Sequence, residues 1–317
     1  MQRLYKKLLD ELEQEGHYLS RASVESFAAT APNRYKVYTI PKRTSGHRVI
    51  AHPSKELKVY QRALVAILEG QLISHHSSYA YKKGVSIKDN ASQHVKNRYL
   101  LKMDFNEFFN SITPEILFQS VSKFSIQFSK SEQKLIENLF FWNKPKTSER
   151  YLVLSVGAPS SPIVSNFVMF SFDTVLESYC HKKSIVYTRY ADDLTFSTNI
   201  KNILFSIPSF VKETLGHIYQ HRITVNNSKT VFSSKAHNRH VTGVTITNEN
   251  NISIGREKKR TISVMVHKHS IGKLEQPDFK YLQGLLSFAH HIEPRFIVSL
   301  KSKYGCSLVD KIIKGGV

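Results

Sequence analysis

Two adjacent aspartates stand at the tip of an expected β-hairpin. Residues 184–198, SIVYTRYADDLTFST, contain two β-rich runs on either side of Asp192 and Asp193. Like charges this close repel each other and raise each other's pKa, and a bound divalent cation removes that conflict. Mg²⁺ favours one or two carboxylates together with substrate phosphates. An isolated Asp-Asp pair is more often a solvated turn or a helix cap, so its chemistry depends on a third carboxylate.

That third carboxylate is Asp104, near the end of the apolar segment 99–105, YLLKMDF, which predicts a short strand. On a neighbouring strand Asp104 would complete a site for two ions. Such a pair of ions activates the 3′-hydroxyl of a growing nucleic acid and stabilises the pyrophosphate leaving group. Asp104, Asp192 and Asp193 are therefore the candidate catalytic residues.

The overall charge favours a polyanionic partner. The chain has 317 residues, with 45 Lys and Arg against 25 Asp and Glu, and the basic residues are spread along it. Nucleic acid is the partner that such a surface indicates, with acidic lipid as the alternative. Two cysteines cannot make a disulfide framework, and neither a secretory signal nor a run of roughly 20 apolar residues is present. We expect a soluble cytoplasmic protein with no membrane partner.

The elements expected around these residues alternate between helices and strands. Residues 2–30 predict one or two helices, and residues 35–53 predict a hairpin that turns at 44–46. A helix is expected from near Ser54, and a long amphipathic helix is expected after 157, with Ser160 or Ser161 as its cap. Further helices are expected at 201–216 and over the last 65 or so residues, with strands at 223–234 and 240–247.

Several blocks resemble those of reverse transcriptases, in the same order along the chain. Residues 190–193 (YADD) resemble the YxDD box, and residues 100–109 resemble the strand that supplies the first metal aspartate. Residues 156–166 resemble the turn and helix that come next along the chain in these enzymes. Residues 226–230 (NNSKT) resemble the box that contains a lysine. The NAxxH string at 90–94 and the VTG string at 241–243 are similar to the boxes of bacterial retron reverse transcriptases.

The resemblance implies an α+β right-hand polymerase fold. It implies a helical segment at 1–34, fingers at 35–100 with part of 112–152, a palm with an antiparallel sheet and helices at 101–247, and a basic helical thumb at 248–317. It also implies an RNA-directed DNA polymerase that uses two Mg²⁺ ions, for which Mn²⁺ can substitute. The enzyme would copy part of its own structured noncoding RNA into short single-stranded DNA, branched from an internal guanosine 2′-hydroxyl, in a bacterial cytoplasm.

Site residues follow from the same resemblance. Phe105 joins the three aspartates at the metal site, and the nucleotide would contact Lys42, Arg48, Phe109, Gly157, Ala158 and Lys229. Phe109 lies five positions after Asp104, where a bulky ring would clash with a ribose 2′-hydroxyl and favour dNTPs. Val156 departs from the glutamine that is usual before the glycine, so a polar contact from that side chain is lost.

The expected RNA contacts lie in the two retron boxes and in the basic C-terminal segment. They are Asn90, His94, Val241, Thr242, Gly243, Arg256, Lys258, Lys259, Arg260 and Lys268. For Asn90 and His94 a structural role is the alternative to RNA contact. The pairs His75-His76 and His290-His291 are expected to be ordinary surface or core histidines, because neither has metal-ligand spacing with a cysteine.

Other functions remain open at this point. A reverse transcriptase of intron-like or repeat-associated type would carry a longer extension, and an RNA polymerase would not favour the aromatic Phe109. A non-catalytic RNA-binding scaffold would be indicated by loss of a metal aspartate, and all three are present. The retron interpretation adds a separate effector or toxin protein as a partner and a role in defence against phage.

Overall fold

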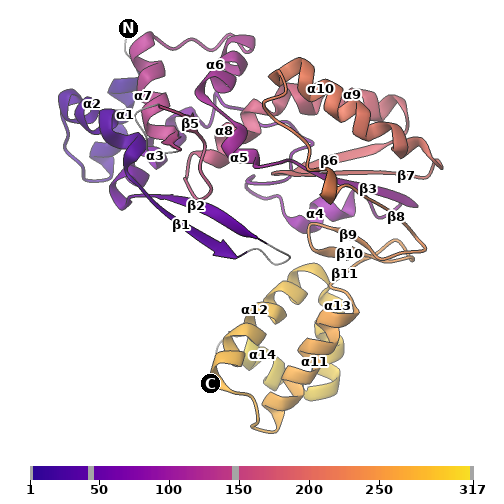
Figure 1. Ribbon diagram of the computed structural model, residues 1–317. Coiled ribbons are helices and arrows are strands. Elements are labelled where there is room, and N and C mark those ends of the chain that lie inside the picture. Colours follow the sequence, from indigo (N-terminus) through magenta and orange to yellow (C-terminus); the bar gives the residue numbers. More distant parts are fainter. Residues whose placement is uncertain (1–2, 42–45, 145–149, 315–317) are drawn as a thin grey trace.

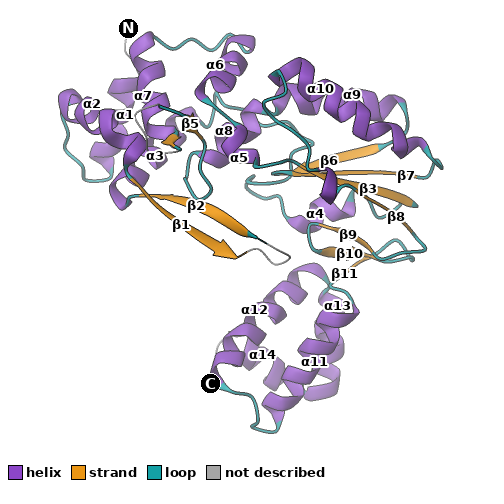
Figure 2. Ribbon diagram, in the orientation of Figure 1, coloured by secondary structure: helices purple, strands orange, loops and turns teal. Residues whose placement is uncertain are grey.

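The computed structural model describes residues 3–41, 46–144 and 150–314 of the chain. Helices and strands are mixed throughout, and the C-terminal helices form a group below the rest (Figures 1 and 2). The α+β fold expected from the sequence is confirmed. No helix within the described ranges is long and apolar enough to cross a bilayer.

The N-terminal region is helical, as predicted. Helix α1 (Arg3–Gln14) buries Leu4, Leu8 and Leu12 and packs on α3 (Lys55–Leu68). Helix α2 (Arg21–Thr30) packs on α7 (Lys130–Phe140). The Ser54 hydroxyl caps α3 by accepting a hydrogen bond from the Leu57 amide at 3.1 Å, so the expected start of this helix is confirmed.

A two-stranded hairpin extends from these helices. Strands β1 (Tyr35–Pro41) and β2 (His47–Pro53) pair antiparallel, with Ile40 opposite Arg48. Most of its residues are exposed on both faces. The expected hairpin is therefore confirmed, whereas most of the expected turn and Lys42 lie outside the described residues.

The central sheet has the strand order β6-β7-β3-β8 and is antiparallel throughout. Its strands are β3 (Tyr99–Asp104), β6 (Val186–Tyr190), β7 (Asp193–Thr198) and β8 (Val231–Ser234). Helices α9 (Phe170–Lys182) and α10 (Ile207–Tyr219) lie together over one face of the sheet (Figure 1). Apolar side chains of strands β3 and β7 therefore line one side of the main hydrophobic core.

The long helix expected after residue 157 is divided in two. Helix α8 (Ser161–Val168) and α9 are separated at Met169, whose ψ of −3° departs from the helical value of about −42°. Ser160 stands at the N-cap without a side-chain cap bond, and the Ser161 hydroxyl instead donates to the Ser155 carbonyl at 2.7 Å. The expectation of one continuous helix was therefore wrong. Ser160 does occupy the predicted cap position, but its hydroxyl donates to the Phe140 carbonyl at 3.4 Å instead of capping the helix.

Short elements complete this region. They are η1 (Ala31–Asn33), α4 (Ile87–Ser92), α5 (Phe108–Ser111), α6 (Pro114–Lys123), β4 (Trp142–Asn143), β5 (Leu152–Val153), η2 (Ile203–Ser206) and η3 (Asn227–Lys229). Helix α5 directly follows β3, so it carries Phe109 next to the strand that ends in Asp104.

A second core joins a small sheet to the C-terminal helices. The sheet has the order β11-β10-β9, with β9 (Arg239–Val241), β10 (Val244–Ile246) and β11 (Ile252–Ser253). Its apolar side chains pack with α11 (Arg256–Ser270), α12 (Gln276–Ile292), α13 (Pro294–Tyr304) and α14 (Cys306–Lys314). The expected border between palm and thumb, at residues 247 and 248, thus falls between β10 and β11 of this sheet.

Candidate active site

Strand pairing brings the three aspartates to one end of the central sheet. Asp104 is the last residue of β3 and lies opposite Asp193, the first residue of β7. Beyond this pair, the Phe105 amide donates to the Asp192 carbonyl at 3.1 Å, and the Asn226 amide donates to the Asp104 carbonyl at 2.7 Å. The positions of these carboxylates are therefore fixed by backbone hydrogen bonds from three segments of the chain.

The turn that carries Asp192 is strained. Tyr190 pairs with Asp193, so Ala191 and Asp192 form a two-residue hairpin turn in which Ala191 has a φ of 55°. A positive φ at this position is usually supplied by glycine, and alanine adopts it at a cost. The Arg189 side chain stabilises the turn by donating from Nη1 to the Ala191 carbonyl at 3.1 Å.

The site concentrates negative charge. Desolvation, followed by the charges of Asp192 and Asp104, raises the pKa of Asp193 to about 6. Desolvation and then Asp104 also raise the pKa of Asp192. Lys229 offsets part of this charge, because its Nζ lies 2.9 Å from both carboxylate oxygens of Asp104. Raised carboxylate pKa values in a shared site are typical of groups that bind cations.

The donor set fits hard divalent ions, since it offers carboxylate oxygens on well-ordered strand ends. Phe105 can contribute only its carbonyl oxygen, because its ring is buried and its amide is bonded to Asp192. Within the described ranges the aspartate oxygens do not all converge within 4.8 Å of one another. Lys229 Nζ contacts both oxygens of Asp104, so this ammonium competes with cations for the Asp104 carboxylate.

The residues predicted to contact the nucleotide come from different elements of the described chain. Arg48 is exposed on β2, and its charge is close enough to lower the pKa of Asp192, although less than desolvation and Asp104 raise it. Phe109 is half-buried on α5 beside Phe108. Gly157 has a φ of 101° and is exposed, whereas Ala158 is buried. Val156 is half-buried.

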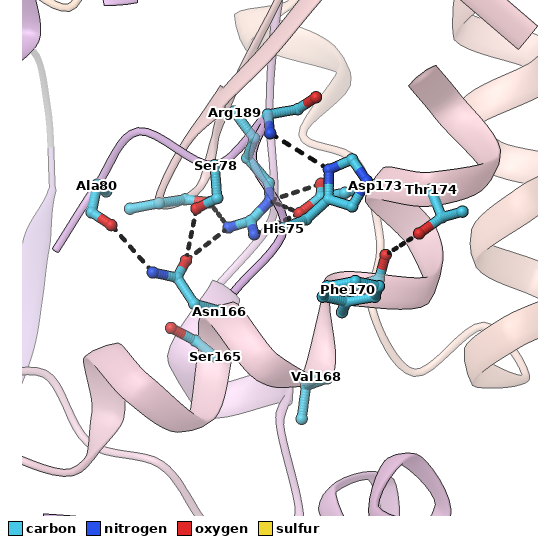
Figure 3. Close-up of polar contacts among 12 residues, drawn as sticks. His75, Ser78, Ala80, Ser165, Asn166, Val168, Phe170, Asp173, Thr174 and Arg189 are labelled. Atoms are coloured by element: carbon cyan, nitrogen blue, oxygen red, sulfur yellow. Dashed lines mark hydrogen bonds and ion pairs between the residues drawn. The ribbon is translucent and has the colours of Figure 1, made fainter. Parts of the chain in front are cut away.

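A fully buried ion pair between Arg189 and Asp173 supports the Ala191-Asp192 turn, the candidate catalytic turn. Figure 3 shows this ion pair among its polar neighbours. Arg189 and Asp173 are both 0% exposed, and Arg189 Nη2 lies 2.7 Å from the carboxylate. The Tyr187 hydroxyl donates to the same carboxylate at 2.7 Å, and Arg189 Nη1 donates to Asn166 Oδ1 at 3.2 Å. Sequence reasoning missed this network; the signal was an arginine in an apolar strand next to the acidic pair.

His75 and His76, the first of the two histidine pairs, form a polar cluster with Glu177 of α9. His75 is buried, His76 is exposed, and the Glu177 carboxylate lies next to both rings. The Ser77 amide donates to His75 Nδ1 at 3.2 Å, and the Ser77 hydroxyl donates to Glu177 at 2.8 Å. Because Nδ1 accepts a hydrogen bond, the ring proton of neutral His75 lies on Nε2, facing Glu177. The cluster is thus satisfied by hydrogen bonds and anchors residues 75–77 to α9.

The two retron-like boxes contact each other. Asn90 Nδ2 lies 3.5 Å from Thr242 Oγ1. His94 is fully buried, with Nδ1 bonded to Ser197 Oγ at 2.7 Å and Nε2 to Thr188 Oγ1 at 2.8 Å. Burial lowers the pKa of His94 to about 3, so this ring is neutral.

The geometry of these boxes therefore favours the structural alternative over RNA contact for the buried side chains of Asn90 and His94. Val241 is likewise fully buried. Thr242 and Gly243 form the two-residue turn between β9 and β10, with φ values of 46° and 79°, and Gly243 is exposed. The exposed parts of the two boxes are therefore Ser92 and Gln93 of the first box and the Thr242-Gly243 turn of the second.

The predicted basic residues of α11 divide into two groups. Arg256, Arg260 and Lys268 are exposed, whereas Lys258 and Lys259 are half-buried. Lys259 Nζ pairs with Glu293 at 2.6 Å, and Lys258 Nζ lies over the Phe288 ring at 5.4 Å. A groove of about 1050 Å³ between the small sheet and the start of α11 is lined by Lys235, His237, His240, Arg256, Lys258 and Lys259, among others.

Comparisons with known proteins agree with this geometry. The family model described as reverse transcriptase (RNA-dependent DNA polymerase) matches residues 40–246. The Escherichia coli Retron Ec83 reverse transcriptase is 49% identical over 280 residues, which cover 88% of this chain and 90% of that protein. The Escherichia coli Retron Ec86 reverse transcriptase is 30% identical over 92% of this chain and 90% of its own length.

Solved structures of other proteins resemble this fold, and a telomerase is an example. An apo telomerase from Candida tropicalis matches with a TM-score of 0.51 and 12% identity, over 89% of this chain and 64% of the telomerase chain. This likeness supports the polymerase fold alone. Reverse transcriptases use divalent metal ions and an RNA template, which suits the carboxylate site and the basic surface. The chain belongs to the bacterial retron reverse transcriptases and is an RNA-directed DNA polymerase.

Proposed function

We propose that this protein copies part of its own structured noncoding RNA into short single-stranded DNA that stays branched to the RNA. The observation that carries the proposal is the meeting of Asp104, Asp192 and Asp193 at one end of the central sheet beside Lys229. In the first step an internal guanosine 2′-hydroxyl attacks the α-phosphorus of a dNTP. A new O2′–P bond forms, and the bond to the leaving pyrophosphate breaks.

Two Mg²⁺ ions, or Mn²⁺ in their place, would be held by the three aspartates and the Phe105 carbonyl. When bound, such ions activate the attacking hydroxyl and neutralise charge on the leaving pyrophosphate. The raised pKa of Asp193 and the desolvation of Asp192 favour cation binding at this end of the sheet. The ammonium of Lys229 would then be free to contact a phosphate of the nucleotide.

The remaining nucleotide contacts would come from the hairpin of Arg48, from helix α5 and from the backbone at 157–158. The Arg48 guanidinium would bind the triphosphate through two hydrogen bonds, and the Lys42 ammonium would supply a second positive charge. Phe109 would exclude a ribose 2′-hydroxyl and so select dNTPs. The exposed backbone of Gly157, with Ala158 behind it, would approach the nucleotide closely, because glycine leaves no Cβ in the way.

The RNA would lie on the basic surface that includes Arg256, Arg260 and Lys268, with the Thr242-Gly243 turn at its edge. Such helices hold folded RNA mainly by shape and phosphate contacts. The half-buried Lys258 and Lys259 would help to shape the groove beside them. We further propose that the RNA and its DNA act with a separate effector protein in defence against phage.

The test is to purify the protein with its flanking locus expressed, and to compare the wild type with Asp192→Asn. Nucleic acid extracted from each is run on a denaturing gel before and after RNase treatment and debranching. A discrete DNA band in the wild type alone, whose mobility shifts after both treatments, supports the proposal. Linear DNA that is unaffected by debranching would contradict the branched product, and RNA without DNA in both samples would indicate a scaffold.

A further inference from the structure

The loop at residues 75–82 is held by the same buried network as the catalytic turn. Ser78 Oγ donates to Asn166 Oδ1 at 2.8 Å, and Asn166 Nδ2 donates to the Ala80 carbonyl at 2.9 Å (Figure 3). The Tyr79 amide donates to the Arg189 carbonyl at 2.8 Å. Because Arg189 also holds Ala191, the loop and the catalytic turn share one rigid support.

Tyr81, at the end of this supported segment, has a strained backbone. Its φ is 61°, in the left-handed region that a bulky residue rarely adopts. The side chain is 54% exposed, so burial of the ring does not compensate for the strain. Backbone strain that the surrounding structure maintains is found most often at functional sites.

The Tyr81 ring lies between two parts of the polymerase site. Its centroid is 6.5 Å from that of Phe109, at an interplanar angle of 44°. Partial desolvation and then the charge of Asp192 raise the pKa of its phenol, which places the ring within electrostatic reach of the catalytic turn. A base stacked between two rings requires parallel planes about 7 Å apart, because each contact is about 3.5 Å. Because the Tyr81 and Phe109 rings are tilted, they do not enclose a base and instead form one continuous aromatic surface.

We propose that Tyr81 is a further positioning residue of the polymerase site, which forms one aromatic wall with Phe109 against the sugar of the incoming deoxynucleotide. The inference rests on the proposed nucleotide site and deepens it. The Tyr81 ring lies against the Phe109 ring, so both the binding of a dNTP and the rejection of an NTP depend on it. The strained φ keeps the ring in this place when no substrate is bound.

The test uses primer extension on poly(rA)–oligo(dT) with dTTP or UTP, for the wild type, Tyr81→Gly, Tyr81→Phe and the control Tyr18→Ala. Tyr18 is 80% exposed and lies far along the chain from the proposed site. We expect Tyr81→Gly to raise KM for dTTP about 10-fold with a smaller change in kcat, and to weaken the preference for dTTP over UTP. Tyr81→Phe and Tyr18→Ala should remain close to the wild type.

Thermal unfolding separates this role from a structural one. Glycine accepts the positive φ, so Tyr81→Gly should keep or raise the Tm while it loses nucleotide affinity. An unchanged KM and an unchanged dTTP preference in Tyr81→Gly would overturn the inference, as would a lower Tm, which would contradict the strain. Failure of the wild type to incorporate dTTP would instead contradict the proposed function.

Discussion

Two arginine side chains are buried in different regions of this protein, and they are held in opposite ways. Arg189, below the catalytic turn, has the Asp173 carboxylate as its partner. Arg239, in the small sheet at the base of the C-terminal helices, is 1% exposed and donates to the carbonyls of Asn97 and Thr247. Among the described residues it has no ion pair, and its Nε has no hydrogen-bond partner.

The presence or absence of a carboxylate partner gives the two arginines different effects on the structure around them. A buried ion pair in which every guanidinium nitrogen is hydrogen-bonded fixes one geometry, and here that geometry holds the turn that carries Asp192. A buried cation held by carbonyl dipoles alone leaves a positive field, and burial lowers the pKa of Arg239 accordingly. The buried support of the turn at Asp192 is therefore charge-compensated, whereas Arg239 next to the basic groove retains an uncompensated positive charge.

Removal of the anion from the compensated pair should have the largest effect. Asp173→Asn leaves Arg189 buried without a counter-charge, so we expect the free energy of unfolding to fall by about 3–5 kcal/mol. Chemical denaturation measures this change. A loss below about 1 kcal/mol would contradict the assignment of a buried, essential pair.

A double variant sharpens the same point. Arg189→Met with Asp173→Leu replaces the pair by apolar groups, so part of the stability should return. Polymerase activity should stay low, because the hydrogen bond from Arg189 to Ala191 is lost. Recovery of both stability and activity would show that the pair does not position the catalytic turn.

The pH dependence of stability should reveal the neutral His94 that ties α4 to the central sheet. Its folded pKa of about 3 lies below the unfolded value of about 6.5, so the unfolded state alone gains a proton between these values. The stability contribution is therefore present above pH 6.5 and is lost as the pH falls, by about 2 kcal/mol at pH 5. The slope of unfolding free energy against pH should be smaller in His94→Gln, and equal slopes would contradict a buried neutral ring.

Arg239 should be easier to replace than Arg189. Arg239→Met removes hydrogen bonds to two carbonyls but also removes the cost of burying an unpaired charge, so we expect a loss of about 1–2 kcal/mol. The measurement is denaturation beside Asp173→Asn under the same conditions. If Arg239→Met proved as costly as Asp173→Asn, the two regions would not differ as described.

The smallest effect is expected at the turn between β9 and β10. Gly243→Ala places a Cβ on a residue with a φ of 79°, with no neighbour within 4 Å, so strain alone should cost about 1 kcal/mol. Gly284→Ala, in the exposed interior of α12, is the matched control and should stabilise by about 0.5–1 kcal/mol. Thermal unfolding of the two variants should therefore shift in opposite directions.

The sequence predicted those parts of the fold in which local patterns and long-range pairing agree. Alternating apolar residues around Asp192 and Asp193 predicted the hairpin, and its pairing with the strand of Asp104 followed once a metal site was assumed. The helices around Leu4, Leu8 and Leu12 were equally clear from their spacing. In these places each residue's local preference already matches its tertiary position.

Tertiary contacts decided the rest. The partner of Arg189 lies 16 residues away in the sequence, at a separation that periodicity cannot pair. Asn90 and Thr242 are 152 residues apart, so their contact could not be inferred from the two short boxes. The ion pair between Lys259 and Glu293 likewise distinguishes a structural lysine from its exposed neighbours only after folding.

The central claim is that the carboxylates of Asp104, Asp192 and Asp193 carry RNA-directed DNA synthesis. The most direct test is incorporation of radiolabelled dTTP on poly(rA)–oligo(dT) with Mg²⁺, for the wild type, Asp192→Asn and the exposed control Asp10→Asn. We predict labelled product from the wild type and Asp10→Asn, and a loss of at least about 1000-fold in Asp192→Asn with an unchanged Tm. Comparable synthesis by folded Asp192→Asn would contradict the account.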